Sequence, residues 1–318
     1  MQNKFNILSK KDFFISSLNG ISCFYFYTTR DYFRQTVNFA ASMSLSIASL
    51  NSGSNGNCYF IGNGEEAVFI DAGLSCRETE LRMKRLGLGM NLVKAIFISH
   101  EHSDHIQGVS QLVAKYKIPV YFSQPTLKEA GFGRIRKYAF HFTATQPVMI
   151  GGLRITAFRK KHDACDPHSF IVSAAKTNIG VFTDIGETCD QLIHYFKQCH
   201  AAFLETNYDE VMLENGSYPV YLKNRIRGGS GHLSNRQALD LYMKHRPSFM
   251  SHLLLSHLSR ENNTPELVES LFTSVPAETR IIIASRYQES ALYQIVAEEK
   301  HFKNLLPKTK TQRQLSLF

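Results

Sequence analysis

Four residues that can bind a metal fall within six positions, HEHSDH, which span residues 100–105. They directly follow the apolar run VKAIFIS, which reads as a buried strand. Burying four polar groups in a core without partners is costly, so they fit a metal site better than a core. His100 and His102 alternate and can point into one ion. Asp104 and His105 turn with the start of a helix and can face a second ion. Nitrogen and oxygen ligands of this kind suit Zn²⁺, Mn²⁺ or Fe²⁺.

Four further residues stand where an apolar segment ends, and they follow one another along the chain. They are Asp71 in VFIDAG, His162 in RKKHDACDP, Asp184 in GVFTDIG and His257 in LLLSHLS. Taken singly, a histidine in such a position is more often an ordinary surface or core residue. In this order, and together with the HxHxDH stretch, the segments resemble the five motifs of the metallo-β-lactamase fold superfamily.

This resemblance implies a role for each residue. One metal would be bound by His100, His102 and His162, and the other by Asp104, His105 and His257, with Asp184 shared. Asp71 would lie behind the ligands and orient their loop. The implied cofactors are two divalent ions, Zn²⁺ or Mn²⁺, which at about 3.5–4 Å apart share a water and lower its pKa toward 7. Asp104 would help to orient the resulting hydroxide.

Longer segments narrow the resemblance to one branch. SGSNGNCYFI, HDACDPHSF, LETNYDEVML and SHLSRENNTPEL together look like the YycJ/WalJ branch, whose members are regarded as exonucleases that act on DNA. The resemblance covers roughly residues 44–300. The long N-terminal extension departs from the pattern of this branch.

The segment GHLSN resembles the Gly-His-Ser-Thr segment of tRNA 3′-processing nucleases, where an additional histidine assists the departing oxygen. On that analogy His232 is the general acid that protonates the leaving alkoxide, a role worth about 10² to 10⁴ in rate. Glu205 in LETN would orient it. The alternative is that His232 merely caps the helical segment that follows.

Three other polar segments have two interpretations each. The basic residues before GHLSN, which could contact phosphates or form a solvated face, are Lys223, Arg225 and Arg227. The Gly-rich stretch Asn51–Asn57 is a hairpin turn or a loop whose amides reach a substrate phosphate. Asn262 and Asn263 cap the next helix or border the site.

The remaining pattern predicts an α/β fold. Residues 45–50, 58–62 and 67–71 are expected strands joined by turns, which gives an antiparallel start. Amphipathic helices and apolar strands alternate after them, and a second group of strands begins near residue 153. Two such similar halves predict two facing sheets with helices outside, an αβ/βα four-layer sandwich.

Composition limits the class of protein. At 318 residues and 43% hydrophobic content, the chain can form one large domain or two small ones. No apolar run reaches the roughly 18–20 residues that span a bilayer, so we expect no membrane segment. The six cysteines are scattered without a disulfide-scaffold spacing. We therefore expect reduced thiols and a cytoplasmic location.

The formal net charge of +9 is concentrated at the two ends of the chain. Residues 1–42 carry a net +3 and residues 303–318 a net +4, which leaves +2 for the body. The charge alone is therefore weak support for binding nucleic acid.

Three regions are predicted. Residues 1–42 form an aromatic-rich extension, either a genuine arm or a segment outside the natural domain, which would then start at Met43. Residues 43–305 form the hydrolase domain, and residues 306–318 a flexible basic tail. The tail ends in a peptide that resembles the short motif by which bacterial replication and repair proteins dock on the sliding clamp: Gln314, Leu315, Ser316, Leu317 and Phe318. The alternative is a frayed terminus with chance leucines.

These observations favour a two-metal phosphodiesterase, a 5′→3′ DNA exonuclease linked to replication or repair. The alternative is a small-molecule hydrolase of the same fold, such as a lactonase, thioesterase or cyclic phosphodiesterase. A third interpretation is a scaffold protein that has lost catalysis. The complete set of predicted metal ligands argues against it.

Overall fold

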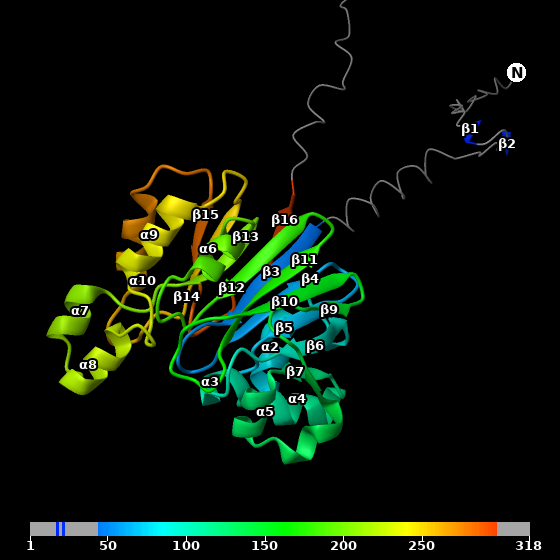
Figure 1. The fold of residues 1–318 in the computed structure, drawn as a ribbon, viewed down its shortest axis with the longest axis horizontal. Helices are drawn as coiled ribbons and strands as arrows, with labels where there is room; N and C mark the ends of the chain where they lie inside the picture. The colour runs from blue at the N-terminus through cyan, green and yellow to red at the C-terminus, as the bar shows by residue number, and fades with distance from the viewer. Residues whose placement is uncertain (1–16, 19–20, 23–43, 298–318) are drawn as a thin grey trace, which may run out of the picture.

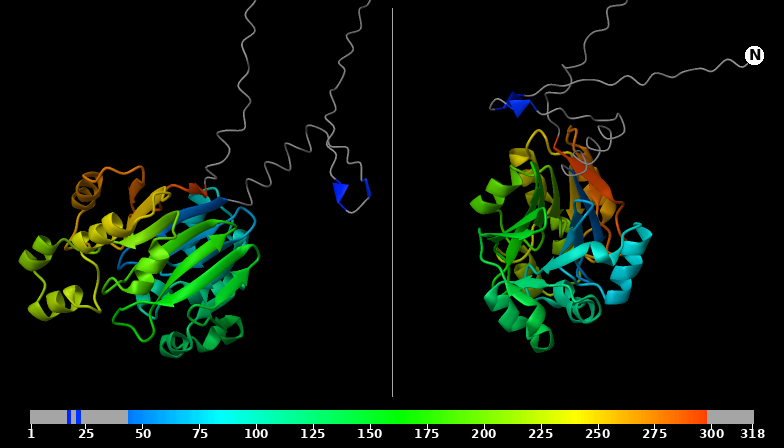
Figure 2. Two further views of the ribbon diagram at one scale, coloured as in Figure 1. Left: turned by 45° about the horizontal axis from the view of Figure 1, so that its top comes forward. Right: turned by 90° about the vertical axis from the view of Figure 1, so that its right-hand side faces the viewer.

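The computed structural model of the protein describes residues 17–18, 21–22 and 44–297. Two mixed β-sheets of seven strands each pack face to face, and helices cover both outer faces (Figures 1 and 2). β1 (Ser17–Leu18) and β2 (Ile21–Ser22) form a separate antiparallel pair. The predicted αβ/βα sandwich is confirmed. The predicted boundaries at 43 and 305 stay predictions, and the QLSLF peptide lies outside the described residues.

The first sheet is built from the N-terminal half and closed by one strand from the end of the domain. Its members are β3 (Ser44–Asn51), β4 (Cys58–Gly62), β5 (Ala67–Ile70), β6 (Val93–Phe97), β7 (Val120–Phe122), β8 (Ala139–His141) and β16 (Tyr293–Val296). Their order is β16-β3-β4-β5-β6-β7-β8. Pairing is antiparallel from β16 to β5 and parallel from β5 to β8.

The second sheet repeats this plan. Its members are β9 (Pro147–Ile150), β10 (Leu153–Arg159), β11 (His168–Ala174), β12 (Thr177–Phe182), β13 (Ala201–Glu205), β14 (His252–Ser256) and β15 (Arg280–Ile283). β9 to β12 pair antiparallel, and β12 to β15 pair parallel. The two similar halves expected from the sequence are therefore present.

Helices follow the parallel strands of each half. They are α2 (Cys76–Arg85), α3 (Ser103–Ile106), α4 (Val109–Tyr116), α5 (Gln124–Ala130), α6 (Asp190–Phe196), α7 (Glu210–Asn215), α8 (Val220–Arg227), α9 (Asn235–His245) and α10 (Pro265–Thr273). Side-chain caps begin several of them; Ser234 and Gln237 form a reciprocal capping box at α9. Among the described residues, no helix combines the length and apolar character that crossing a membrane requires.

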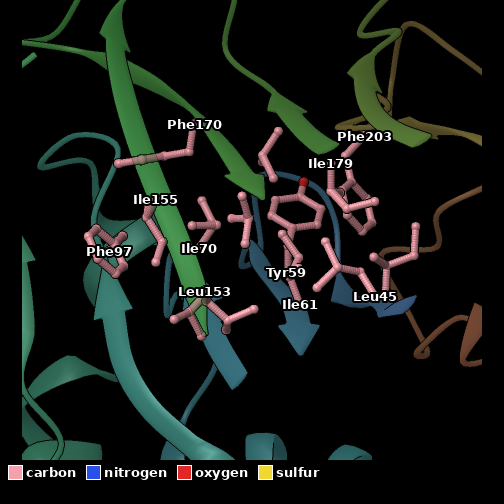
Figure 3. Close-up of a cluster of buried hydrophobic side chains, with 14 of the residues drawn as sticks. Leu45, Tyr59, Ile61, Ile70, Phe97, Leu153, Ile155, Phe170, Ile179 and Phe203 are labelled. Carbon is pink, nitrogen blue, oxygen red and sulfur yellow. The ribbon is translucent and has the colours of Figure 1, made fainter. Parts of the chain in front are cut away.

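The main core lies between the sheets, where side chains from both inner faces meet (Figure 3). Tyr59 of β4 and Phe203 of β13 have ring centroids 4.8 Å apart, and Phe97 of β6 meets Phe170 of β11 at 5.9 Å. Fully burying such side chains contributes about 1.5–3 kcal/mol each. This packing fixes the two sheets relative to each other and therefore fixes the loops that leave their edges.

Seven described strands and α-helices were not predicted from the sequence: β1, β2, β8, β9, β16, α7 and α8. No residue of α8 is buried, so no apolar face marks this segment as a helix. Figure 1 shows α7 and α8 projecting beyond the sheets. β16 pairs with β3 from more than 200 residues away in sequence, which no local pattern can indicate.

Candidate metal centre

The site lies where strands of both sheets end. β5 and β6 run parallel in one sheet, and β12, β13 and β14 run parallel in the other, so their carboxyl ends gather at one edge of each sheet. Three residues within two positions of the ends of such strands have positive φ: Asp71 (62°), Asp184 (54°) and His257 (58°). Only three other non-glycine residues among those described have positive φ. Strained backbone of this kind persists where the surroundings enforce it, and here it turns three side chains into the site.

The first predicted ligand group is brought together by the structure. His100, His102 and His162 each offer a ring nitrogen, and these atoms lie within 4.8 Å of one another. His100 Nε2 is 3.1 Å from His102 Nδ1. His162 Nδ1 donates to the carbonyl oxygen of Gly231 at 3.0 Å, which leaves its Nε2 as the ligand atom.

The second predicted group, Asp104, His105 and His257, also meets within 4.8 Å. His105 Nε2 lies 3.5 Å from Asp104 Oδ2, and His257 Nε2 lies 3.7 Å from the same oxygen. Asp184 stands between the two groups. Its Oδ2 is 3.3 Å from His105 Nε2 and its Oδ1 is 3.9 Å from His162 Nε2. A carboxylate in this position can serve both groups.

Asp71 lies behind the ligands, in contact with His105. Its Oδ2 is 2.8 Å from His105 Nδ1 and accepts from the hydroxyl of Ser99 at 2.8 Å. Its Oδ1 accepts from the backbone N–H of Ser99. A carboxylate on Nδ1 fixes the tautomer and directs Nε2 to the site, as in many metal-binding histidines.

Burial and charge divide the histidines into two kinds. Burial lowers the pKa of His100 well below its ordinary value, and the charges of His105 and Lys160 lower it further. Burial also lowers the pKa of His162, to about 4. Both rings are therefore neutral at pH 7, which is the form that binds a metal.

In the metal-free protein the pKa values of His105 and His257 are shifted in the opposite direction, upward. Burial alone lowers the pKa of His105, but Asp71, Asp184 and Asp104 raise it well above its ordinary value. The pKa of His257 is raised to about 10, because Asp184, Asp104 and Glu205 outweigh the effect of burial. These rings act as cations that partly balance the buried carboxylates, a role that a divalent ion would take over.

The residues fit bound divalent ions. Three buried atoms of the predicted ligand set have no hydrogen bond within the described residues: His162 Nε2, Asp184 Oδ2 and His257 Nε2. Buried polar atoms without partners are rare because they lose their hydration without compensation. A pair of cations held by the predicted ligand groups would satisfy all three atoms. Nitrogen and carboxylate donors suit Zn²⁺ and Mn²⁺.

His232 and Glu205 form a pair beside the ligands. Glu205, fully buried, lies 2.8 Å from His232 Nδ1 and 2.9 Å from His257 Nδ1 through the same oxygen, Oε1. Burial raises the pKa of Glu205, but His232 and His257 lower it to about 2, so the carboxylate is ionised. His232 Nδ1 is 3.8 Å from Asp184 Oδ1. The structure thus places the predicted acid and its orienting group next to the metal ligands.

The predicted phosphate contacts lie on α8 and are engaged with other protein groups. Arg225 forms an ion pair with Asp163, and Arg227 pairs with Glu214 at 2.8 Å. Lys223 donates to the carbonyl oxygen of Glu214. Their contact with a substrate stays a prediction.

Two segments whose role the sequence did not decide, the Gly-rich loop and Asn262–Asn263, lie near the site. Asn57, at the end of the Gly-rich loop, donates to Asp104 Oδ2 at 3.1 Å and lies 3.1 Å from His105 Nε2. The loop is therefore a turn that also supports the ligands. Asn263 accepts from the N–H of Thr264, the residue that caps α10, and donates to the carbonyl oxygen of Asn207. It braces the loop after β13.

Sequence reasoning missed three residues that hold the ligands in place. Ser99 Oγ bridges Asp71 and His100, and Asn207 donates to the carbonyl oxygen of His257. Lys160, only 6% exposed, donates from Nζ to the carbonyl oxygen of Thr183, directly before Asp184. A signal existed only for Lys160, which stands two positions before His162 at the end of a strand.

Comparison with known proteins agrees with this geometry. Residues 66–257 match the sequence pattern of the beta-lactamase superfamily domain. The exodeoxyribonuclease YycJ of Bacillus anthracis is 34% identical over 239 residues, which cover 74% of this chain and 90% of that protein. The exodeoxyribonuclease WalJ of Streptococcus pneumoniae is 30% identical over 225 residues, which cover 69% of this chain and 83% of that protein. Among solved structures, the metallo-beta-lactamase fold protein YhfI from Bacillus subtilis has the same fold, with a TM-score of 0.61 and 15% identity over 79% of this chain and 99% of that one.

Proposed function

Because the chain belongs to the beta-lactamase superfamily and to the branch of the exodeoxyribonucleases YycJ and WalJ, we propose that this metal-dependent hydrolase removes nucleotides from DNA with two divalent ions at its metal centre. We extend the proposal to a 5′→3′ direction and to a role in replication or repair. A DNA substrate agrees with the cytoplasmic location that the sequence predicts.

The observation that carries the proposal is the Glu205–His232 pair beside two adjoining ligand groups. Transfer of a phosphoryl group to water expels an alkoxide, which needs a proton as the bond breaks. We assign this proton to His232, which lies beside the predicted ligands. Glu205 stays ionised and accepts from the N–H at Nδ1 of His232, so Nε2 is left to serve the leaving group. Nε2 can give up a proton only from the cationic ring, which has a proton on each nitrogen and becomes the neutral Nδ1–H form afterwards.

The protein's own residues would divide the remaining tasks. His100, His102 and His162 would hold one ion, and Asp104, His105 and His257 the other, with Asp184 between them. Bound there, two divalent ions would supply Lewis acidity toward the phosphate and toward the attacking water. Asp104, 19% exposed, is placed to orient that water. Asp71 and Ser99 keep the ligand loop in position.

A comparison of substrate classes tests the proposal. The purified, metal-loaded protein is offered end-labelled single- and double-stranded DNA, RNA, a lactone, a thioester and a cyclic phosphodiester. We expect the highest kcat/KM on DNA, with mononucleotides as products from the first time point. A higher kcat/KM on any small molecule would replace the proposal with a small-molecule hydrolase, and internal fragments at early times would replace the exonuclease with an endonuclease.

We also propose that the C-terminal peptide docks on a bacterial sliding clamp. The peptide Gln314–Phe318 offers alternate apolar side chains on a basic tail, and such a tether would raise the local concentration of the enzyme at DNA. A pull-down compares the full chain with one that lacks Gln314–Phe318. Clamp binding by the full chain alone is expected; equal binding by both chains would remove this proposal.

A further inference from the structure

A cavity of about 90 Å³ lies beside the metal centre without including any of the predicted ligands. Its wall begins at Leu258, the residue after the ligand His257, and continues through Ser259 and Arg260. Ser52, which also lines the cavity, accepts from the backbone N–H of His257 at 2.7 Å through Oγ. The cavity therefore shares backbone with the metal centre, and a group bound in it would be a near neighbour of the reacting bond.

Arg286 gives the cavity an unsatisfied positive charge. Its Nη1 is buried and has no hydrogen bond within the described residues, whereas its Nη2 donates to Ser54 Oγ at 3.1 Å. A guanidinium keeps its charge at every physiological pH. A buried N–H of this kind needs an acceptor, and an anion would provide one.

The other lining groups also suit an anion. Arg260 lines the same cavity, with its Nε 3.5 Å from Glu261 Oε1 and its side chain 70% exposed. The backbone N–H of Ser259 donates to the carbonyl oxygen of Asn207. The hydroxyl oxygen of Ser259 accepts from the backbone N–H of Asn262, so the hydroxyl proton remains available for an anion. Tyr287, 72% exposed, also lines the cavity, and an exposed aromatic ring is a group on which a base can stack.

The wall that carries Arg286 is held in place by hydrogen bonds to the Gly-rich loop. Asn55 donates to the carbonyl oxygen of Arg286 at 2.8 Å, and Ser52 N–H donates to that of Ser285 at 3.1 Å. Arg82, buried in α2, donates both to the carbonyl oxygen of Leu50 and to that of Tyr287. The two segments are more than 200 residues apart in sequence, yet they form one braced unit.

Gly53 allows the guanidinium to lie along the loop. A Cβ at this position would come within 3.2 Å of Arg286 Cβ and 3.7 Å of its Cζ. The absence of a side chain at Gly53 thus sets the position of the positive charge.

We propose that this cavity is a phosphate subsite, in which Arg286 and Arg260 bind a phosphate of the nucleic-acid strand next to the bond that is cleaved. That the phosphate belongs to a nucleic-acid strand rests on the proposed function. A phosphate is a tetrahedral anion whose oxygens accept several N–H and O–H bonds at once, which matches the donors present. The group bound is either the terminal phosphate of the strand or an internal one, and these two sources differ in charge and position.

Binding measurements test the subsite independently of turnover. The metal-loaded protein is titrated with fluorescent oligonucleotides whose end linkages are phosphorothioates, which slow hydrolysis, and which carry a 5′-phosphate or a 5′-hydroxyl. The variants are Arg286→Gln, Arg286→Lys and the control Arg154→Gln. Arg154 is exposed near the start of β10, whereas the site lies beyond the other end of this strand. The control Arg154→Gln therefore removes the same positive charge far from the cavity.

The expected result is a dissociation constant raised about ten- to hundredfold in Arg286→Gln, as for a lost bond to a charged group. The slope of log K against log salt should decrease by about 0.7–0.9, as for one lost phosphate contact, while Arg286→Lys keeps the slope. Loss confined to the 5′-phosphorylated strand identifies a terminal phosphate, and equal loss for both strands identifies an internal one. If the wild type binds the oligonucleotides, Arg286→Gln that binds them like Arg154→Gln, with the same slope, shows that the cavity does not hold a phosphate of the strand; the cavity as a phosphate site is then decided by inorganic phosphate.

Inorganic phosphate separates this inference from the proposed function. The rise in melting temperature on adding phosphate is measured in the metal-loaded wild type and in the same variants. Any phosphate that binds to the metal ions contributes equally to all of these proteins. A smaller shift in Arg286→Gln than in Arg154→Gln upholds the subsite even for a protein that neither binds nor cleaves DNA. Equal shifts, together with equal oligonucleotide binding, reject it.

Discussion

Glu205 Oε1 lies 2.8 Å from His232 Nδ1, and both residues stand beside the predicted metal ligands. Glu205 has no exposed surface, whereas the side chain of His232 is 21% exposed. One end of the ring is therefore fixed by a buried charge, and the other end can face a substrate. This arrangement agrees with the proposed proton donor better than with a helix cap. Consistent with this, the cap of α9 is Ser234 and not His232.

Replacing His232 with Ala should lower kcat on DNA by about 10² to 10⁴ and leave KM and metal content nearly unchanged. The loss should be much smaller on a p-nitrophenyl phosphodiester, because nitrophenolate leaves without a proton. Parallel assays on the two substrates measure the difference. The control His141→Ala removes a ring from the exposed end of β8. Equal losses on both substrates would show that His232 does not protonate the leaving group.

Replacing Glu205 with Gln should weaken the metal centre as well as the acid. The carboxylate also holds His257 Nδ1 at 2.9 Å, and loss of such a supporting group typically costs 10- to 100-fold in metal affinity. Competition with a chelator measures this affinity. Glu214→Gln, an exposed change of the same chemistry, is the control. Unchanged affinity in Glu205→Gln would mean that His257 is not held through this carboxylate.

Metal binding should release protons. In the metal-free protein the pKa of His257 is about 10 and that of His105 lies well above its ordinary value, so both rings are protonated at pH 7. A histidine must be neutral to bind a metal, so the affinity of the site formed by Asp104, His105 and His257 for a metal ion should rise with pH up to about 10. Titration with Zn²⁺ in weakly buffered solution should acidify it. Binding without proton release would contradict the assignment of these two ligands.

The same shift predicts how the metal-free protein responds to pH. Because the pKa of His257 in the folded chain is above its unfolded value of about 6.5, its contribution to stability is complete below pH 6.5. That contribution should be lost as the pH rises toward 10. Chemical unfolding of the metal-free protein at several pH values measures the decline, and a free energy of unfolding that increases between pH 7 and 10 would be the opposite result.

Replacing Gly73 with Ala should disturb the ligand loop. A Cβ at this position would lie 1.6 Å from the carbonyl oxygen of Asp104, which accepts from the N–H of Asn57. Asp104 and His105 must then move, and the bound metal should fall from two ions to about one. Elemental analysis measures the content. In the control Gly133→Ala the new Cβ meets no atom within 4 Å. Full metal content in Gly73→Ala would show that this close contact is not needed.

Much of the site could be predicted because its residues carry local signals. His100, His102, Asp104 and His105 form one short motif after an apolar strand. His162, Asp184 and His257 each follow an apolar strand as well, and only their order, together with the resemblance, marks them as ligands. Alternation of apolar strands and amphipathic helices was sufficient for the fold class.

The residues that could not be predicted act through contacts between distant segments. Arg286 lies against the Gly-rich loop across more than 200 residues of sequence. Lys160 is a buried lysine, although lysines are almost always exposed; its place two residues before His162 was the one hint, and its bond to the carbonyl oxygen of Thr183 exists only in the folded sheet. Asn57 has the sequence context of a turn, and its contact with Asp104 exists only once the sheet has formed.

The central claim is that this metal centre hydrolyses DNA. The most direct test is the release of mononucleotides from end-labelled duplex DNA by the wild type and by His102→Ala, each with Mn²⁺ or Zn²⁺ and with a chelator. We predict release by the wild type that stops on chelation, returns with added metal and is absent in His102→Ala. Nucleotide release that is independent of metal, or no release by the metal-loaded wild type, would contradict the account.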